Sequence, residues 1–333
     1  MRLGPRVGLL IAAAAMLLAY GLAEPYANFL GTVYVDLDKG MPARKLAERL
    51  ADAGVIRYAW LFLAVRALHP SARVQAGEYE FHGPESVWRV FDRVRRGDVY
   101  YFELTVPEGS NIFDIAALLN QAGLVPAAEF LASAADPRMV RDLDPAAPSL
   151  EGYLFPSTYR INHVTTAEEL CRQMTAEFRR HWKQLVSGAK DADPHTMVTL
   201  ASMVEKETAA PDERPLIASV FFNRLQKQMR LECDPTTIYA AELEQRYRGA
   251  IHRSDLASQN LYNTYQHTGL PPGPIANPGV ESLKAVLHPA ETDYLFFVAK
   301  PGGSGEHHFS ATLAQHEKAV KDYRSGQAKV QAR

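Results

Sequence analysis

Two stretches of this chain, 69 residues apart, share one pattern of apolar and glycine positions. Residues 33–56 align without gaps on residues 102–125; each alternates like a strand, turns at a glycine, and continues with apolar positions at helical spacing up to a second glycine. An aromatic segment that contains glycine follows each copy, at residues 76–81 and 151–155. The pattern predicts a duplicated unit of strand, one or two helices, and strand. Two unrelated amphipathic helices that share an Ala-Gly stop are the alternative.

The second half of the chain is mostly helical by pattern. Apolar spacing predicts helices at about 166–185, 196–209 and 212–228, and a capping box that begins at Thr312 predicts the start of a last helix. Residues 260–279 contain prolines among glycines, which predicts a stiff functional loop that forms the wall of a cleft. With 47% hydrophobic residues, the chain is expected to be a globular α+β protein.

The N-terminus carries an uncharged apolar run. Arg2 and Arg6 precede Val7, and no charged residue occurs from there to Ala23, a run of 17 residues. A helix of this length is at the short end of what spans a bilayer. We expect an uncleaved membrane anchor; a cleaved secretory signal and a buried core helix are the alternatives. Because no Lys or Arg follows the run before Lys39, the positive-inside rule predicts a cytoplasmic N-terminus and an exported remainder.

Charge and residue counts exclude several classes of protein. The chain has 36 Lys and Arg residues against 38 Asp and Glu residues, and a net charge of −2 gives no reason to expect a nucleic-acid partner. Cys171 and Cys233 lie in unrelated contexts, which excludes a disulfide framework and leaves at most one bridge. His307, His308 and His316 lack metal-site spacing, since adjacent residues of a strand point to opposite faces. We therefore predict no metal and no cofactor.

The helix expected around residues 196–208 carries two glutamates beside its apolar face. At about 100° per residue, Glu205 and Glu207 lie on opposite shoulders of the apolar stripe, and Lys206 points away from it. Burial raises the pKa of a carboxyl group, which is what a general acid near neutral pH requires. Two border glutamates that pair with Lys or Arg are the alternative, and the pattern does not choose between the two carboxyl groups.

Polar and aromatic residues follow this helix in two clusters. Aromatic faces beside amide and hydroxyl groups suit carbohydrate rings, which stack on aromatic rings and need directional hydrogen bonds. The candidate substrate-binding residues are Glu207, Arg230, Asp234, Thr236, Thr237, Tyr239, Asn263, Thr264 and Tyr265.

Several long motifs follow one another along the second half of the chain. They are ASMVEKETA at 201–209, ASVFFNRL at 218–225, MRL at 229–231 with DPT at 234–236, YNTY at 262–265, GLPPGPIANPG at 269–279, and a closing His308-Phe309 before His316. In this order the motifs resemble the YceG/MltG family of endolytic murein transglycosylases, and the resemblance extends over essentially the whole chain. Several long motifs in the right order are far more specific than one short pattern.

The resemblance implies a single-pass protein of the inner membrane whose catalytic domain lies in the periplasm. It implies four parts: a cytoplasmic stub and transmembrane anchor at residues 1–27, a LysM-like βααβ module at 32–100, a mixed, largely helical catalytic domain at 101–325, and a polar tail at 326–333. Within the catalytic domain, residues 101–160 are a candidate second copy of the LysM-like unit.

The resemblance also implies an activity. The family cleaves the MurNAc-GlcNAc bond within nascent peptidoglycan strands by an intramolecular route, which leaves 1,6-anhydroMurNAc ends and terminates strand elongation. The family's catalytic glutamate corresponds to Glu205, the glycan strand is the substrate, and peptidoglycan synthases are candidate partners. The chain departs from the family pattern at Glu232 and Cys233, next to Asp234. A hydrolytic muramidase that uses Glu205 with Asp234 or Glu207, and a non-catalytic membrane-tethered peptidoglycan-binding scaffold, are the alternatives.

Overall fold

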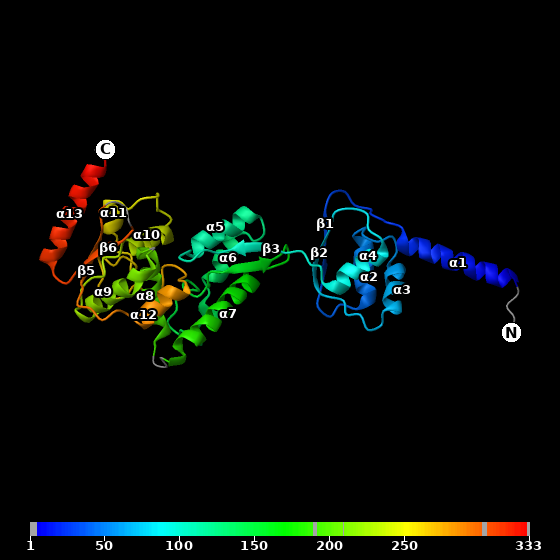
Figure 1. Ribbon diagram of the computed structural model, residues 1–333, viewed down its shortest axis with the longest axis horizontal. Helices are drawn as coiled ribbons and strands as arrows, with labels where there is room; N and C mark the ends of the chain where they lie inside the picture. Colours follow the sequence, from blue (N-terminus) through cyan, green and yellow to red (C-terminus); the bar gives the residue numbers. More distant parts are fainter. Residues whose placement is uncertain (1–4, 189–191, 209, 302–304, 332–333) are drawn as a thin grey trace. The chain divides into compact units, whose positions relative to one another are not determined.

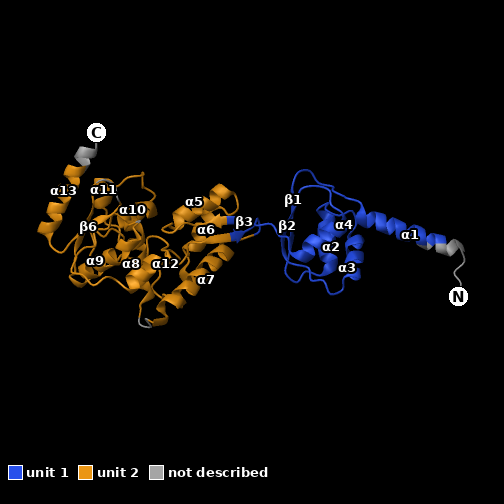
Figure 2. Ribbon diagram, in the orientation of Figure 1, with its two compact units in different colours: residues 1–103, 160–164 blue, residues 104–159, 165–333 orange. Residues whose placement is uncertain are grey.

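The chain folds into two compact units. The computed structural model describes residues 5–188, 192–208, 210–301 and 305–331. One unit comprises residues 1–103 and 160–164, and the other comprises residues 104–159 and 165–333 (Figure 2).

The first unit contains the first copy of the repeated pattern. Its elements are α1 (Pro5–Ala23), β1 (Val33–Leu37), α2 (Ala43–Asp52), α3 (Ala59–Leu68), β2 (Gly77–Phe81) and α4 (Val87–Arg96) (Figure 1). β1 and β2 pair antiparallel, with Val35 opposite Tyr79. Leu50 of α2, Phe62 of α3 and Val90 of α4 are buried with these strands in one core. The predicted order of strand, two helices and strand is therefore observed.

The second unit is mostly helical. Its elements are β3 (Phe102–Thr105), α5 (Ile112–Ala122), α6 (Ala127–Ala134), β4 (Thr158–Ile161), α7 (Ala167–Leu185), α8 (Pro194–Glu207), α9 (Arg214–Gln226), α10 (Asp234–Leu243), α11 (Arg253–Leu256), α12 (Val280–Leu287), β5 (Phe296–Ala299), β6 (His307–Ser310) and α13 (Leu313–Gln331). β3 and β4 each include residues that belong to the first unit. Short 3-10 helices occupy Pro137–Met139, Val186–Gly188 and Pro211–Glu213. β3 pairs with β4, and β5 pairs with β6. The protein is thus a mixed α+β chain with small sheets, as predicted.

The second copy has the same element order as the first, with a correction to its last strand. Asn111 starts α5 with a capping box to Asp114, and Gly123 ends the helix with a φ of 68°. The strand that follows α6 is β4, residues 158–161, and not the aromatic segment 151–155. That segment is a buried turn, because it is enclosed by the rest of the unit instead of presenting one face to solvent. A sequence pattern of buried aromatic residues does not distinguish these two cases.

The helices expected in the second unit are confirmed. α7, α8 and α9 each lie within two residues of the predicted bounds. The predicted capping box is also present, since the Gln315 N–H donates to Thr312 Oγ1 at 3.4 Å and the Gln315 side chain accepts from the Thr312 N–H at 3.2 Å. α13 continues to Gln331, so most of the stretch expected to be a polar tail is helical.

The predicted N-terminal anchor lies within the described residues, but the start of the expected cytoplasmic stub does not. α1 occupies Pro5–Ala23, and residues 1–4, the start of the expected cytoplasmic stub, lie outside them. Across the segments that the structure describes, no helix combines the length and the apolar character needed to cross a membrane. The expected transmembrane helix is therefore not confirmed, and the LysM-like character of the first unit stays a prediction.

Candidate active site

Helix α8 carries the candidate acid in its last turn. Asp193 caps the helix, because its side chain accepts a hydrogen bond from the Thr196 N–H, and Pro194 occupies the first helical position. Residues 198–204 are all buried, and α8 packs against α9, α10 and α12 (Figure 1). Glu205 therefore follows directly after a segment that is enclosed on all sides.

Glu205 lies between two hydrogen-bond donors. Its side chain is only 6% exposed. The backbone N–H of Gly279 donates to Oε2 at 2.9 Å, and Nη2 of Arg214 donates to Oε1 at 3.3 Å. A guanidinium group makes charge-assisted hydrogen bonds to a carboxylate, which are stronger than neutral ones. The carboxyl group is therefore shielded from bulk solvent, as predicted, and its orientation is fixed.

A second carboxyl group, that of Glu108, lies against Gly279. A Cβ added to Gly279 would come within 2.0 Å of Glu108 Oε1, so the Glu108 carboxyl group fills the space beside this glycine. Burial raises the pKa of the Glu108 carboxyl, and Glu205 raises it further, whereas Arg214 lowers it. Glu108 as a whole residue is exposed. The buried carboxyl group of Glu205 and the carboxyl group of an exposed residue thus lie at the same glycine.

Two loops bring these groups together. The Gly109 N–H donates to the Asn277 carbonyl at 3.0 Å, and the Asn277 N–H donates to the Ser110 carbonyl at 2.9 Å. Nζ of Lys206 donates to the Gly109 carbonyl at 3.1 Å. Gly109 has a φ of 74°, and a Cβ there would lie 3.4 Å from Glu205 Cγ. The loop that follows β3 is therefore joined both to the Pro/Gly loop and to the end of α8.

Asn277 is the polar centre of the Pro/Gly loop. It is fully buried, its Oδ1 accepts from the Gly152 N–H at 2.9 Å and the Leu154 N–H at 2.8 Å, and its Nδ2 donates to the Ser110 carbonyl and to Glu151 Oε1, both at 2.9 Å. Burial raises the pKa of the Glu151 carboxyl to about 8, although the hydrogen bonds that it accepts oppose this shift. All four hydrogen-bonding positions of one amide are used to hold three loops together.

Sequence comparison places these loops and helices in one known family. The chain matches the YceG-like family over residues 35–322. It belongs to that family. A relative from Bacillus subtilis (strain 168), named endolytic murein transglycosylase, is 33% identical over 333 aligned residues, and the match covers 94% of this chain and 91% of the relative. A relative of the same name from Streptococcus pneumoniae serotype 2 (strain D39) is 27% identical, and the match covers 89% of this chain but 59% of the relative.

A solved structure agrees with this assignment. A crystal structure of a YceG-like protein from Listeria monocytogenes is similar to this chain with a TM-score of 0.57 at 30% sequence identity. The match covers 87% of this chain and 99% of that chain.

In this YceG-like protein, Glu207 has different surroundings from Glu205. Burial raises the pKa of the Glu207 carboxyl, a hydrogen bond from the Cys233 thiol lowers it, and the Asp234 carboxylate raises it. Burial and the Glu207 carboxylate also raise the pKa of the Cys233 thiol, which is free of any disulfide. The two glutamates of α8 therefore interact with different residues.

Four of the predicted substrate-binding residues form a buried network. Thr236, Thr237, Asn263 and Thr264 are at most 1% exposed. Thr236 Oγ1 and Thr264 Oγ1 lie 2.9 Å apart, and Thr237 Oγ1 donates to Asn263 Oδ1 at 3.2 Å. Because these groups are bonded to one another and shielded from solvent, in this structure they support the loop that begins at residue 260 instead of presenting polar atoms to a ligand.

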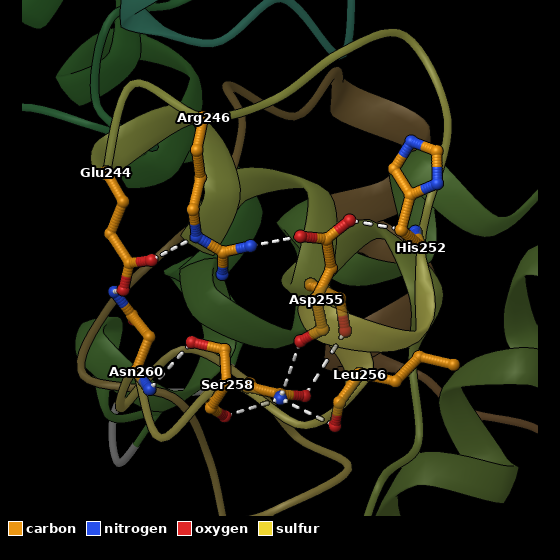
Figure 3. Close-up of polar contacts among 9 residues, drawn as sticks. Glu244, Arg246, His252, Asp255, Leu256, Ser258 and Asn260 are labelled. Atoms are coloured by element: carbon orange, nitrogen blue, oxygen red, sulfur yellow. Dashed lines mark hydrogen bonds and ion pairs between the residues drawn. The ribbon is translucent and has the colours of Figure 1, made fainter.

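The Asn263 amide also holds a surface turn around α11. Its Nδ2 donates to the backbone carbonyls of Asp255, Leu256 and Ser258. The Asp255 carboxylate accepts from the His252 N–H at 2.8 Å and pairs with Arg246 (Figure 3). The Asn263 side chain therefore holds the backbone of the turn in place, which explains why an amide occupies this buried position.

Apart from Glu207, the other predicted residues lie nearer the surface, with one exception. Asp234 and Arg230 are exposed, and the Tyr265 hydroxyl donates to Asp234 Oδ1 at 2.7 Å. Tyr239 is the exception: it is 3% exposed, and its hydroxyl is hydrogen-bonded to Glu151. Arg230, Asp234 and Tyr265 are thus the members of the predicted set that can meet a ligand without rearrangement.

Sequence reasoning did not identify two of the groups around Glu205. Glu108 aligns with Lys39 in the first copy of the repeat, so the reversal of charge between the copies was the available signal. Arg214 carries no comparable signal, because a single arginine at the start of a helix is common. Asn277 and Gly279 lie within the Pro/Gly loop that was predicted to be functional.

Proposed function

We propose that this protein is a lytic transglycosylase that cleaves the glycan strands of peptidoglycan, with Glu205 as its catalytic residue. The observation that carries the proposal is the shielded Glu205 carboxyl group, held by Arg214 and Gly279 at the end of α8. The names of the relatives from Bacillus subtilis and Streptococcus pneumoniae support it. Such an enzyme is a lyase, because no water enters the products.

A single carboxyl group suffices for this chemistry. Protonated Glu205 donates its proton to the glycosidic oxygen, and the bond between that oxygen and C1 of the muramic acid breaks, which leaves positive character at C1. The resulting carboxylate removes the proton of the C6 hydroxyl of the same sugar as O6 bonds to C1. The proton thereby returns to Glu205, and the strand carries a 1,6-anhydro end. The attack is intramolecular and benefits from a high effective concentration of the nucleophile.

The neighbours of Glu205 fit the second half of this cycle. The Gly279 N–H and Arg214 stabilise the carboxylate that remains after proton donation. Before donation the acid must hold a proton, so at least one of these contacts must loosen when the sugar binds. Asp234 and Tyr265 are candidates for hydrogen bonds to the sugar hydroxyl and acetamido groups.

We infer further that the substrate is the nascent strand, whose cleavage terminates elongation. This assigns the second unit to the periplasm and α1 to the inner membrane, with the N-terminus in the cytoplasm and peptidoglycan synthases as partners. The exposed apolar side chains of α1, among them Leu9, Leu10 and Leu17, support this location. Fractionation of cells tests it, because the full chain is expected in the membrane pellet after a high-salt wash, and recovery in the soluble fraction would contradict it.

Glu205→Gln tests the catalytic role. The variant keeps the size and shape of the side chain but has no proton to donate, so it should fold normally and lose cleavage of uncrosslinked glycan strands by at least about 100-fold. Glu168→Gln, on the exposed face of α7, is the matched control and should cleave like the wild type. Substantial cleavage by folded Glu205→Gln would refute the proposal.

A further inference from the structure

The reaction proposed above needs one carboxyl group, yet two lie against the same glycine. We propose that Glu108 is a positioning residue: its carboxylate, held beside Gly279, shares Arg214 with Glu205 and thereby keeps Glu205 able to hold the proton that it donates. This inference rests on the proposed function of Glu205.

Gly279 defines the geometry of the pair. Its N–H donates to Glu205 Oε2 at 2.9 Å, while a Cβ added to it would lie 2.0 and 2.7 Å from the two carboxyl oxygens of Glu108. The φ of Gly279 is −76°, which any residue can adopt. The backbone conformation therefore does not require glycine, and it is the Glu108 carboxyl group that leaves no room for a side chain.

The backbone fixes Glu108 in this place. Gly109 and Ser110, which follow it, make two backbone hydrogen bonds with Asn277, two residues before Gly279. The Gly109 carbonyl also accepts from Nζ of Lys206 at 3.1 Å. Because the loop is tied on both sides, the backbone of Glu108 stays where its side chain can place the carboxyl group against Gly279.

Arg214 has a hydrogen-bond donor that Glu205 does not use. One hydrogen bond joins its Nη2 to Glu205, whereas its Nε is buried and has no hydrogen-bond partner among the described residues. Its charge also acts on the Glu108 carboxyl, whose pKa it lowers. Both carboxyl groups lie at Gly279, and the guanidinium that is hydrogen-bonded to Glu205 also acts on Glu108 through its charge. In our proposal, a shift of Arg214 toward Glu108 releases Glu205 to hold a proton.

The charges around Glu205 determine the sign of the effect. Arg214 at the start of α9 and Lys206 on α8 itself are positive, while Glu108 and Glu281 at the start of α12, with Glu242 on α10, are negative. Lys206 is bonded to the Gly109 carbonyl, Glu281 to Lys284 and Glu242 to Asn111. A negative charge near a carboxyl group favours its protonated form. Removal of the Glu108 charge leaves Arg214 acting on Glu205 alone, which favours the carboxylate.

The first test is the pH profile of Glu108→Gln. The rate falls at high pH when the catalytic acid loses its proton, and in Glu108→Gln this alkaline limb should move to lower pH by at least about 0.5 unit. Glu281→Gln removes a charge near the same turn that is paired with Lys284; it is the control and should move the limb by less than half as much as Glu108→Gln does. An unshifted alkaline limb in folded Glu108→Gln would overturn the inference.

The second test uses the crowding at Gly279. Gly279→Ala forces the Glu108 carboxyl group away while the backbone N–H to Glu205 remains, so it should lower the cleavage rate about tenfold or more and shift the limb as Glu108→Gln does. In a Glu108→Ala background the same change should alter the rate less than about twofold, because the obstructing group is absent. Equal losses in both backgrounds would show that Gly279 acts without Glu108 and would overturn the inference.

The two proposals fail in different ways. Cleavage by Glu205→Gln would contradict the proposed function itself. An inactive Glu205→Gln together with an unshifted Glu108→Gln profile would leave the function standing and contradict only the role of Glu108.

Discussion

At the scale of single residues, the chemistry of each carboxyl group is set by its neighbours. Glu205 accepts from a guanidinium and a backbone N–H, whereas Glu151 is enclosed with Asn277 and has no cation among its hydrogen-bond donors in the described structure. Without a cation to compensate the loss of solvation, burial dominates, and the pKa of Glu151 rises to about 8. Glu151 therefore retains its proton in the folded state at pH values at which an exposed glutamate is ionised.

This predicts a pH-dependent contribution to stability. Between the ordinary pKa of a glutamate and about 8, folded Glu151 holds a proton that the unfolded chain releases, so its stabilising contribution is complete at low pH and is lost as pH rises toward 8. Glu151→Gln should remove this dependence, so its Tm relative to wild type should increase from pH 5.5 to pH 8. The first pH is about one unit above the ordinary pKa of a glutamate, and the second is at the raised pKa. Thermal unfolding of both proteins at the two pH values measures this difference in Tm. The same difference at both pH values would contradict the prediction.

The sequence identified some of these residues for a physical reason. Glu205 could be predicted because helical periodicity places it beside an apolar stripe, and this periodicity can be read from the sequence alone. Its neighbours Arg214, Glu108 and Gly279 come from three other segments of the chain, and no local sequence pattern predicts which segments contact one another in the fold. Thr236 and Asn263 were predicted as ligand contacts because residue type alone does not reveal burial.

At the scale of elements, the Pro/Gly loop is a buried part of the core. Residues 273–279 are all buried, and the Ile275 N–H donates to Ser202 Oγ on α8 at 3.0 Å. The prediction of a stiff loop is consistent with this packing, but Pro274 also fills space against the turn at residues 151–155. The repeat pattern predicted the order of elements in both copies, whereas the position of the last strand depended on this tertiary packing.

Two glycines provide a matched test of that packing. Gly152 and Gly123 both have positive φ, of 88° and 68°, but a Cβ on Gly152 would lie 2.4 Å from Pro274 whereas nothing lies within 4 Å of one on Gly123. Gly123→Ala should lower the free energy of unfolding by about 1–2 kcal/mol, from backbone strain alone. Gly152→Ala should lower it by about 3 kcal/mol or more, because strain and overpacking combine.

Urea unfolding of the two variants measures the difference. Equal losses would mean that the contact between the turn and Pro274 contributes nothing to stability, and would contradict the packing described for this loop.

At the scale of the whole molecule, each unit buries its own aromatic core. Phe62 is fully buried in the first unit, and Phe178 is fully buried in the second, where its ring lies 5.1 Å from that of Tyr153. Phe62→Ala and Phe178→Ala should each cost about 3–5 kcal/mol in the unit that contains the substitution.

Calorimetry of the intact chain distinguishes the two effects. Phe62→Ala should lower the transition of the first unit and leave cleavage by the second unit unchanged, whereas Phe178→Ala should lower the transition that accompanies loss of activity on heating. If Phe62→Ala shifted both transitions equally, the division into two units would not describe the unfolding of this protein.

The account depends most directly on what the reaction leaves at the new end of the glycan. Mass spectrometry of the products released from uncrosslinked strands by the wild-type protein decides this. Intramolecular attack by the C6 hydroxyl predicts muramic acid ends that lack one water relative to reducing ends. Products that carry that water would show hydrolysis and contradict the proposal that Glu205 works alone as acid and base.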